Sequence, residues 1–260
     1  NMVWLMPFML ITACSNRSEE SDRKNLLLLT VDTLRADHLG CYGYTRDTSP
    51  FFDELAKEGA LFANAFSHST WTQPSVASLM TSTNPSAERT KHVLEHGLSG
   101  ETVLLSEILK ENRYRTLAVV SNYNIGKNYH YDQGFDVFIE SWMELFRRTT
   151  GKRKFKNKPG LVKQYTNATI VTDQAIRLLR KYSGRGSYFL WVHYMDSHGP
   201  YIPPKSYEKY FSDWTPGDSV PIEKIIKYQR LKKPGTDELS NDGEYYRVQY
   251  DRSIRYWDDD

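Results

Sequence analysis

The stretch Trp71–Thr81 places a hydroxyl group where it could attack a sulfuryl or phosphoryl group. It begins with polar residues and continues as small and apolar residues, a pattern typical of a loop that enters a helix. Thr72 would cap this helix, and Pro74 would lie in its first turn, where a missing N–H costs nothing. Helix starts attract anions through unpaired N–H groups and a partial positive charge. Thr72 is therefore a candidate nucleophile, although a purely structural N-cap would give the same pattern.

A carboxylate follows the first long apolar run of the chain. Residues 25–31 form this run, which ends at Asp32 and predicts a parallel strand buried on both faces. Open α/β sheets place their binding sites at the carboxyl ends of such strands. A carboxylate there is a candidate ligand for a hard divalent cation. The alternative is that Asp32 only caps the following turn.

A second polar cluster follows the apolar run over residues 187–194, which predicts another strand. The cluster contains Asp196 and His198 and ends at Tyr201. His198 could donate a hydrogen bond to a substrate oxygen or carry a proton, and Asp196 could orient it or help to bind a metal. The alternative is that His198 is an ordinary surface residue of a loop.

Further elements must position these groups. The apolar periodicity predicts helices over residues 51–59, 103–112 and 170–182, strands over 61–66 and 116–121, and a turn at 134–136. Asn122 and Asn124 follow the second of these strands. An amphipathic run with Tyr250, Ile254 and Trp257 predicts a last helix. Because strands and helices alternate, we expect an α/β fold with a mostly parallel sheet and helices on both faces.

Composition narrows the class of protein. The chain has 260 residues, of which 39% are hydrophobic and 13% aromatic, as expected for one large globular domain. The net charge of +2 argues against a nucleic-acid partner. Two cysteines, Cys14 and Cys41, exclude a disulfide framework. Residues 146–160 hold seven basic residues and no acidic one, which predicts a solvated loop or a patch that attracts an anionic substrate or lipid headgroup.

The N-terminal segment has the character of a secretion signal. Residues 2–13 are apolar and uncharged, and they are too few to span a bilayer comfortably. The residues up to Cys14 resemble a bacterial lipoprotein cleavage box, in which the cysteine is lipidated. This predicts a signal peptide over residues 1–14, a lipid anchor at Cys14 and a polar tether over residues 15–24. Ser15 then favours the periplasmic face of the outer membrane; the alternative is an ordinary signal peptide with an incidental cysteine.

Four stretches together resemble the sulfatase branch of the alkaline phosphatase superfamily. They are similar to the family's opening strand and first metal-ligand loop (residues 25–43), its next helix (48–62), its nucleophile signature (72–81) and its His-x-Pro-Tyr loop (196–201). Each motif alone is weak, but all four occur in the family's order and at about its spacing. The resemblance covers about residues 25–201 and implies the α/β fold of that superfamily.

The resemblance also implies roles for individual residues. Asp32 would bind a metal, Thr72 would be both metal ligand and nucleophile, and His198 would contact the transferred group or the leaving oxygen. The residues expected to contact the substrate are Asn122, Asn124 and Asp196. The cofactor would be a divalent cation, either calcium or a transition metal such as zinc or manganese. The substrate would be a small-molecule or glycan ester of sulfate or phosphate.

Three positions depart from the family pattern. Sulfatases convert a Cys or Ser to formylglycine at the nucleophile position, and Thr72 cannot become that aldehyde. Val76 replaces the signature arginine, and Thr33 replaces the second aspartate of the usual pair. A threonine nucleophile is instead similar to phosphodiesterase and phosphonate-hydrolase relatives, in which a metal lowers the pKa of the hydroxyl. The family's late Asp-His or Asp-Asn ligands have no counterpart before Asp260, so we expect them in a C-terminal part beyond this sequence.

The sequence therefore predicts a metal-dependent hydrolase of the sulfatase family, tethered to a membrane as a lipoprotein, with residues 25–260 as the N-terminal part of its catalytic domain. One alternative is a transferase on the same fold, which moves a phospho-substituent from a lipid to a glycan. Another is a catalytically inactive lipoprotein that binds anions, for which Thr33 and Val76 are the best evidence.

Overall fold

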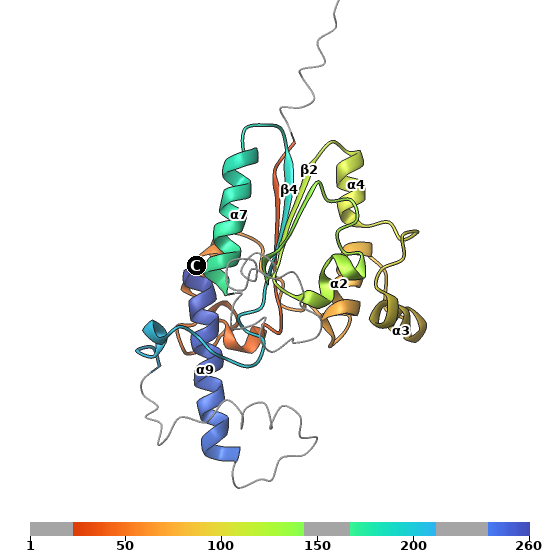
Figure 1. Ribbon diagram of the computed structural model, residues 1–260. Coiled ribbons are helices and arrows are strands. Elements are labelled where there is room, and N and C mark those ends of the chain that lie inside the picture. The colour runs from red at the N-terminus through yellow and green to blue at the C-terminus, as the bar shows by residue number, and fades with distance from the viewer. Residues whose placement is uncertain (1–22, 143–166, 212–238) are drawn as a thin grey trace, which may run out of the picture.

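The four strands of the structure form one parallel sheet (Figure 1). This computed structural model describes residues 23–142, 167–211 and 239–260. The strands are β1 (Leu26–Val31), β2 (Arg115–Val120), β3 (Val137–Glu140) and β4 (Tyr188–Tyr194), and the sheet order is β1-β4-β2-β3. All three pairings are parallel, which confirms the predicted sheet. The predicted signal peptide, Cys14 and the basic stretch over residues 146–160 lie outside the described residues.

Helices cover both faces of this sheet (Figure 1). The α-helices are α1 (Pro50–Glu58), α2 (Thr72–Thr81), α3 (Ala87–His96), α4 (Leu105–Glu111), α7 (Ala168–Tyr182) and α9 (Leu239–Asp259). Short 3-10 helices are η1 (Ala36–His38), η2 (Gly40–Tyr42), η3 (Tyr123–Ile125), η4 (Lys127–Tyr129) and η5 (Lys205–Tyr207). In the described ranges, none of the helices combines the length and the apolar character needed to cross a membrane.

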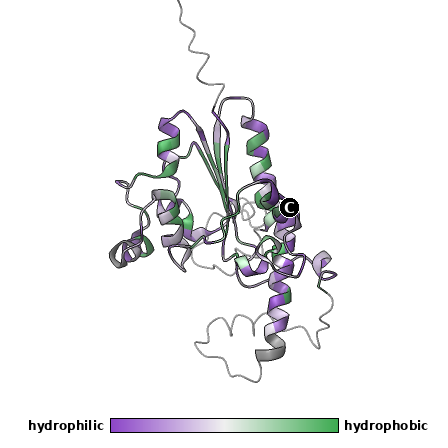
Figure 2. Ribbon diagram, turned by 180° about the vertical axis from the view of Figure 1, so that it is seen from behind, coloured by the Kyte–Doolittle hydropathy of each residue, from purple (hydrophilic) through white to green (hydrophobic). Residues whose placement is uncertain are grey.

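The two faces of the sheet carry separate apolar cores because side chains alternate along each strand. Leu117 and Val119 of β2 face α7 and α9, where they pack with Val171 and Ile254. Ala118 and Val120 face the opposite layer, and the buried residues there include Met80, Leu104 and Trp191. Figure 2 shows mostly apolar strands between helices that carry both apolar and hydrophilic residues. The helices predicted over residues 51–59, 103–112 and 170–182, and the helix with Tyr250, are confirmed as α1, α4, α7 and α9.

Two local predictions were wrong. Residues 61–66 form a loop instead of a strand, and the side chains of Phe62 and Phe66 are 73% and 83% exposed. Strand β1 was expected to be buried on both faces, but it lies at an edge of the described sheet. Leu27 is 56% exposed there, because β4 is the one described strand that pairs with β1. An apolar run shows that a strand avoids water, but it does not show which neighbours will cover it.

Candidate functional site

The loops that follow β1 and β4 are bonded to each other at the carboxyl edge of the sheet. The backbone N–H of Asp32 donates to Tyr194 O at 2.9 Å, which extends the ladder by one residue. Thr33 then turns the chain with a positive φ of 58°, and its hydroxyl donates to Ser197 O at 2.7 Å. In return, the Ser197 hydroxyl donates to the carbonyl of Asp32 at 2.8 Å. These bonds fix the backbone that carries the Asp32 carboxylate.

Side chains from three other elements converge on one oxygen of that carboxylate. The Thr72 hydroxyl donates to Asp32 Oδ2 at 2.9 Å, and the Asn122 side-chain amide donates to the same oxygen at 2.9 Å. Nε2 of His193 lies 3.6 Å from it. Asp32 is only 9% exposed. The structure therefore brings Asp32, Thr72 and Asn122 together, although 90 residues separate the ends of this trio in the sequence.

The Asp32 carboxyl stays ionised despite its burial. Burial alone would raise its pKa, because it removes water from the charged form. The nearby rings of His193 and His198 and the hydroxyl of Thr72 oppose this effect and lower the pKa to about 2. Asp32 is therefore an anion at neutral pH and a weak base.

Thr72 is the first residue of α2, not its cap. The N-cap position is occupied by Trp71, and the predicted capping role of Thr72 is wrong. Its hydroxyl donates a charge-assisted hydrogen bond to the Asp32 carboxylate. The prediction that Pro74 lies in the first turn is confirmed. The loop before α2 is held by a hydrogen bond between the hydroxyls of Ser67 and Ser75 at 2.7 Å.

The other predicted site residues lie in different surroundings. Asn124 is exposed, and its backbone N–H donates to Asn122 Oδ1 at 2.9 Å. Asp196 Oδ1 accepts from the backbone N–H of Ala168 at 3.0 Å, which ties this carboxylate to the start of α7. A substrate role for Asn124 and Asp196 stays a prediction. His198 is half-buried, and its Nδ1 lies 2.8 Å from Gly199 O. Because a carbonyl only accepts, Nδ1 of His198 must carry a hydrogen.

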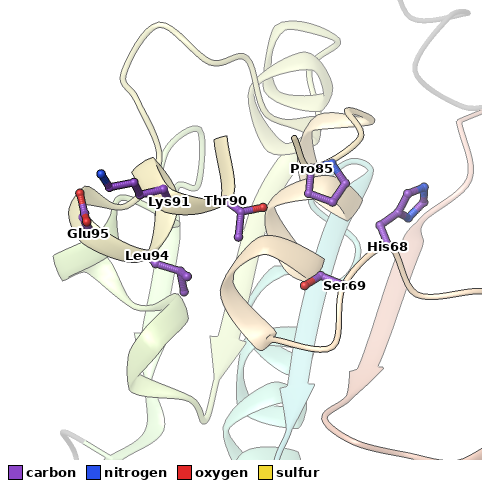
Figure 3. Close-up of a pocket in the computed structure, with 7 residues that line it drawn as sticks. All are labelled: His68, Ser69, Pro85, Thr90, Lys91, Leu94 and Glu95. Carbon is purple, nitrogen blue, oxygen red and sulfur yellow. The ribbon is translucent and has the colours of Figure 1, made fainter. Parts of the chain in front are cut away.

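An open hollow of about 590 Å³ lies between the loop before α2 and helix α3. Figure 3 shows its lining residues. They are His68, Ser69, Pro85, Thr90, Lys91, Leu94 and Glu95. None of these residues is among those around Asp32. The two charged residues of the hollow, Lys91 and Glu95, carry opposite charges. The candidate catalytic residues therefore do not line this hollow.

Helix α9 holds the loop that follows Asp32, a role that the sequence did not reveal. The Tyr250 hydroxyl donates to Thr33 O at 2.8 Å and accepts from the backbone N–H of Arg35 at 2.8 Å. The next residue of α9, Asp251, bonds to His38 Nδ1 at 2.6 Å. His193 was also missed, because a histidine inside an apolar strand gives no pattern of its own. The one available signal was its place on the strand that precedes the polar cluster.

The donors around Asp32 fit a divalent cation in chemical type. An ionised carboxylate and a neutral hydroxyl are hard oxygen donors of the kind that such cations prefer. They would supply only part of a ligand set. Within the described residues, no group of three or more His, Cys, Asp or Glu could hold a metal ion.

Comparisons with known proteins show which sequences and folds the chain is similar to. The chain is 29% identical to iduronate 2-sulfatase of Mus musculus over 221 residues, which are 77% of this chain and 40% of that protein. A solved structure from Vibrio parahaemolyticus, described as a protein in the alkaline phosphatase superfamily, matches 91% of this chain and 50% of its own with a TM-score of 0.54 and 19% identity. The soluble domain of lipooligosaccharide phosphoethanolamine transferase A from Neisseria meningitidis matches 91% of this chain and 59% of its own with a TM-score of 0.61 and 16% identity.

These likenesses confirm the predicted α/β fold, and the chain spans less than half the length of the curated relative. The sequence profile of the family described as Sulfatase matches residues 24–259. Since that match covers nearly the whole chain, this protein belongs to the sulfatase family.

Proposed function

We propose that the full-length protein is a metal-dependent hydrolase of sulfate or phosphate esters with Thr72 as its nucleophile. The observation that carries this proposal is the 2.9 Å hydrogen bond from the Thr72 hydroxyl to the Asp32 carboxylate at the carboxyl edge of the sheet. Homology supports the hydrolase class, since the curated relatives are sulfatases. The identity of the nucleophile rests on this geometry and on the place of Thr72 in the stretch that resembles the family's nucleophile signature.

The hydrogen bond orients Thr72 for attack. Its hydrogen points at Asp32, so its oxygen lone pairs face away from the carboxylate. Asp32 is too weak a base to remove that hydrogen unaided. A bound divalent cation would supply the positive charge that lowers the pKa of the hydroxyl and polarises the ester. The residues that would hold it are Asp32 and Thr72, with further ligands from outside the described residues.

The covalent step follows from this orientation. The Thr72 hydroxyl releases its proton to solvent water, its oxygen forms a bond to sulfur or phosphorus, and the bond to the leaving alcohol oxygen breaks as that oxygen takes up a proton. The start of α2 favours the negative charge of the transferred group, because Thr72 lies in its first turn. His198 holds a hydrogen on Nδ1, so its neutral ring accepts at Nε2 and its protonated ring donates there. That property suits the exchange of a proton with the leaving alcohol and then with the water that cleaves the Thr72 ester.

Metal dependence is the first test of this proposal. We expect the full-length protein to hydrolyse an aryl sulfate, an aryl phosphate or a diaryl phosphate, to lose that turnover in EDTA, and to regain it with calcium, manganese or zinc. The physical reason is that Asp32 cannot activate Thr72 without added positive charge. Turnover that survives complete removal of divalent cations would contradict the proposal.

A transferase on the same fold is the second candidate. The favouring observation is that Thr72 keeps a plain hydroxyl, so its covalent ester could pass to an alcohol acceptor instead of to water. The fold is shared with a phosphoethanolamine transferase. Activity that requires a lipid donor and is lost in lipid-free assays would favour the transferase. Tight binding of sulfate or phosphate esters without any turnover would instead support an inactive anion-binding protein.

We also propose that the protein is anchored by a lipid on Cys14 at the periplasmic face of the outer membrane. We expect Cys14→Ser to abolish incorporation of labelled palmitate and to move the protein from the detergent phase to the aqueous phase. The matched control is Cys41→Ser, which changes the chain's other cysteine and should leave both results as in the wild type. Equal labelling of Cys14→Ser and wild type would contradict the anchor.

A further inference from the structure

His193 places a buried ring nitrogen against the Asp32 carboxylate. The residue is 2% exposed and lies on the central strand β4. Its Nε2 is 3.6 Å from Asp32 Oδ2, which is longer than a hydrogen bond, and no other hydrogen-bond partner for Nε2 occurs in the part of the chain that the structure describes. A buried polar atom without a hydrogen-bond partner costs free energy. The position of His193 Nε2 next to the Asp32 carboxylate therefore indicates that the two groups interact.

The other ring nitrogen is fixed by a relay of hydrogen bonds. Nδ1 of His193 lies 2.8 Å from the hydroxyl of Thr30. Trp191 Nε1, which can only donate, gives its hydrogen to the same hydroxyl at 3.0 Å. The Thr30 hydrogen is therefore available for His193 Nδ1 at 2.8 Å or for Val192 O at 3.4 Å, and the shorter contact is the stronger one.

This relay, together with the Asp32 carboxylate, indicates which nitrogen of His193 carries a hydrogen. If Thr30 donates to Nδ1, then Nδ1 is the acceptor and the neutral ring holds its hydrogen on Nε2. That hydrogen faces the carboxylate oxygen that also receives Thr72 and Asn122. The opposite tautomer would turn a lone pair of Nε2 toward a negatively charged oxygen, and the two would repel each other.

We propose that His193 is a positioning residue of the site: Trp191 and Thr30 fix its tautomer so that Nε2–H holds Asp32 Oδ2 in place to receive the Thr72 hydroxyl. The inference rests on the proposed function in one respect, because it takes the Asp32–Thr72 pair to be the site. The relay itself is a property of the apo chain, so it can be tested separately from catalysis.

The test is ¹⁵N NMR of the histidine ring, which distinguishes a nitrogen with hydrogen from one without. In the wild type at neutral pH we expect the hydrogen of His193 on Nε2 and an unprotonated Nδ1. Thr30→Val keeps the shape of the side chain but removes the hydroxyl, so the fraction of rings with the hydrogen on Nδ1 should rise above that of the wild type. Thr30→Ser keeps the hydroxyl and should retain the wild-type spectrum. A hydrogen on Nδ1 in the wild type, in either the neutral or the charged ring, would overturn the proposal.

A pair of variants at His193 itself tests the action on Asp32. Gln places an amide N–H near the position of Nε2, whereas Asn reaches only to the position of Nδ1. We expect His193→Gln to bind Mn²⁺ in the full-length protein within a few-fold of the wild type, and His193→Asn to bind it about 10- to 100-fold more weakly, as is usual when a partner of a metal ligand is lost. Equal Mn²⁺ affinity of the two variants would overturn the proposal, whatever Thr72→Ala does to turnover.

Discussion

Asp251→Ala should lower the free energy of unfolding by about 3–5 kcal/mol, because it removes one partner of a buried ion pair. Asp251 has no exposed surface. Its Oδ1 lies 2.6 Å from His38 Nδ1, and its Oδ2 accepts from the Tyr44 hydroxyl at 2.7 Å and from Arg46 Nη1 at 2.8 Å. The substitution leaves the Arg46 charge and two polar groups without this acceptor in a buried place.

The matched control for this prediction is Glu244→Ala, which removes the other carboxylate bound to Arg46. Its side chain is 26% exposed and accepts from Arg46 Nη2 at 2.7 Å. Because water reaches this pair, its loss should cost about 1 kcal/mol or less. Urea unfolding of both variants measures the difference. If Asp251→Ala costs no more than Glu244→Ala, the buried network contributes less than its geometry indicates.

The Asp251 network also bears on the site. It joins α9 to the loop between Asp32 and α1, and the neighbouring Tyr250 hydroxyl bonds to Thr33 O. Loss of Asp251 should therefore loosen the backbone that carries the Asp32 carboxylate. Turnover of the folded fraction should fall in Asp251→Ala and stay near the wild-type value in Glu244→Ala.

Thr72→Ala should reduce turnover by at least about 10³-fold, because removal of a catalytic nucleophile costs up to about 10⁶-fold. The fold should remain intact, because Thr72 is half-buried and alanine is favourable in a helix. Thr72→Ser is the matched control, since it keeps the hydroxyl that donates to Asp32. It should retain much of the turnover, with some loss from the freer rotation of a side chain that lacks the methyl group.

The sheet could be predicted from the sequence because its strands are long apolar runs. Residues 116–121 and 187–194 were predicted as strands, and β2 and β4 confirm both. The same logic placed Asp32 at the carboxyl edge of the sheet, where the structure has it. It could not give the edge position of β1, because the order of strands depends on pairing between residues far apart in the chain.

Part of the site could also be predicted from local sequence patterns. Thr72 and Asp32 were singled out by local signals, and the structure joins them across 40 residues of sequence. His193 could not be found this way, because its partners Thr30 and Asp32 lie on a neighbouring strand and loop. Local pattern also mistook Thr72 for an N-cap, because it could not show that the helix begins one residue earlier, with Trp71 as the N-cap.

The most direct test of the central claim is the mass of the Thr72 peptide after the full-length protein has turned over an ester and been quenched in acid. The account predicts one added sulfuryl or phosphoryl group on Thr72 in the wild type, and neither the added group nor substantial turnover in Thr72→Ala. Unchanged turnover in Thr72→Ala, or a transferred group attached to a different residue, would contradict it.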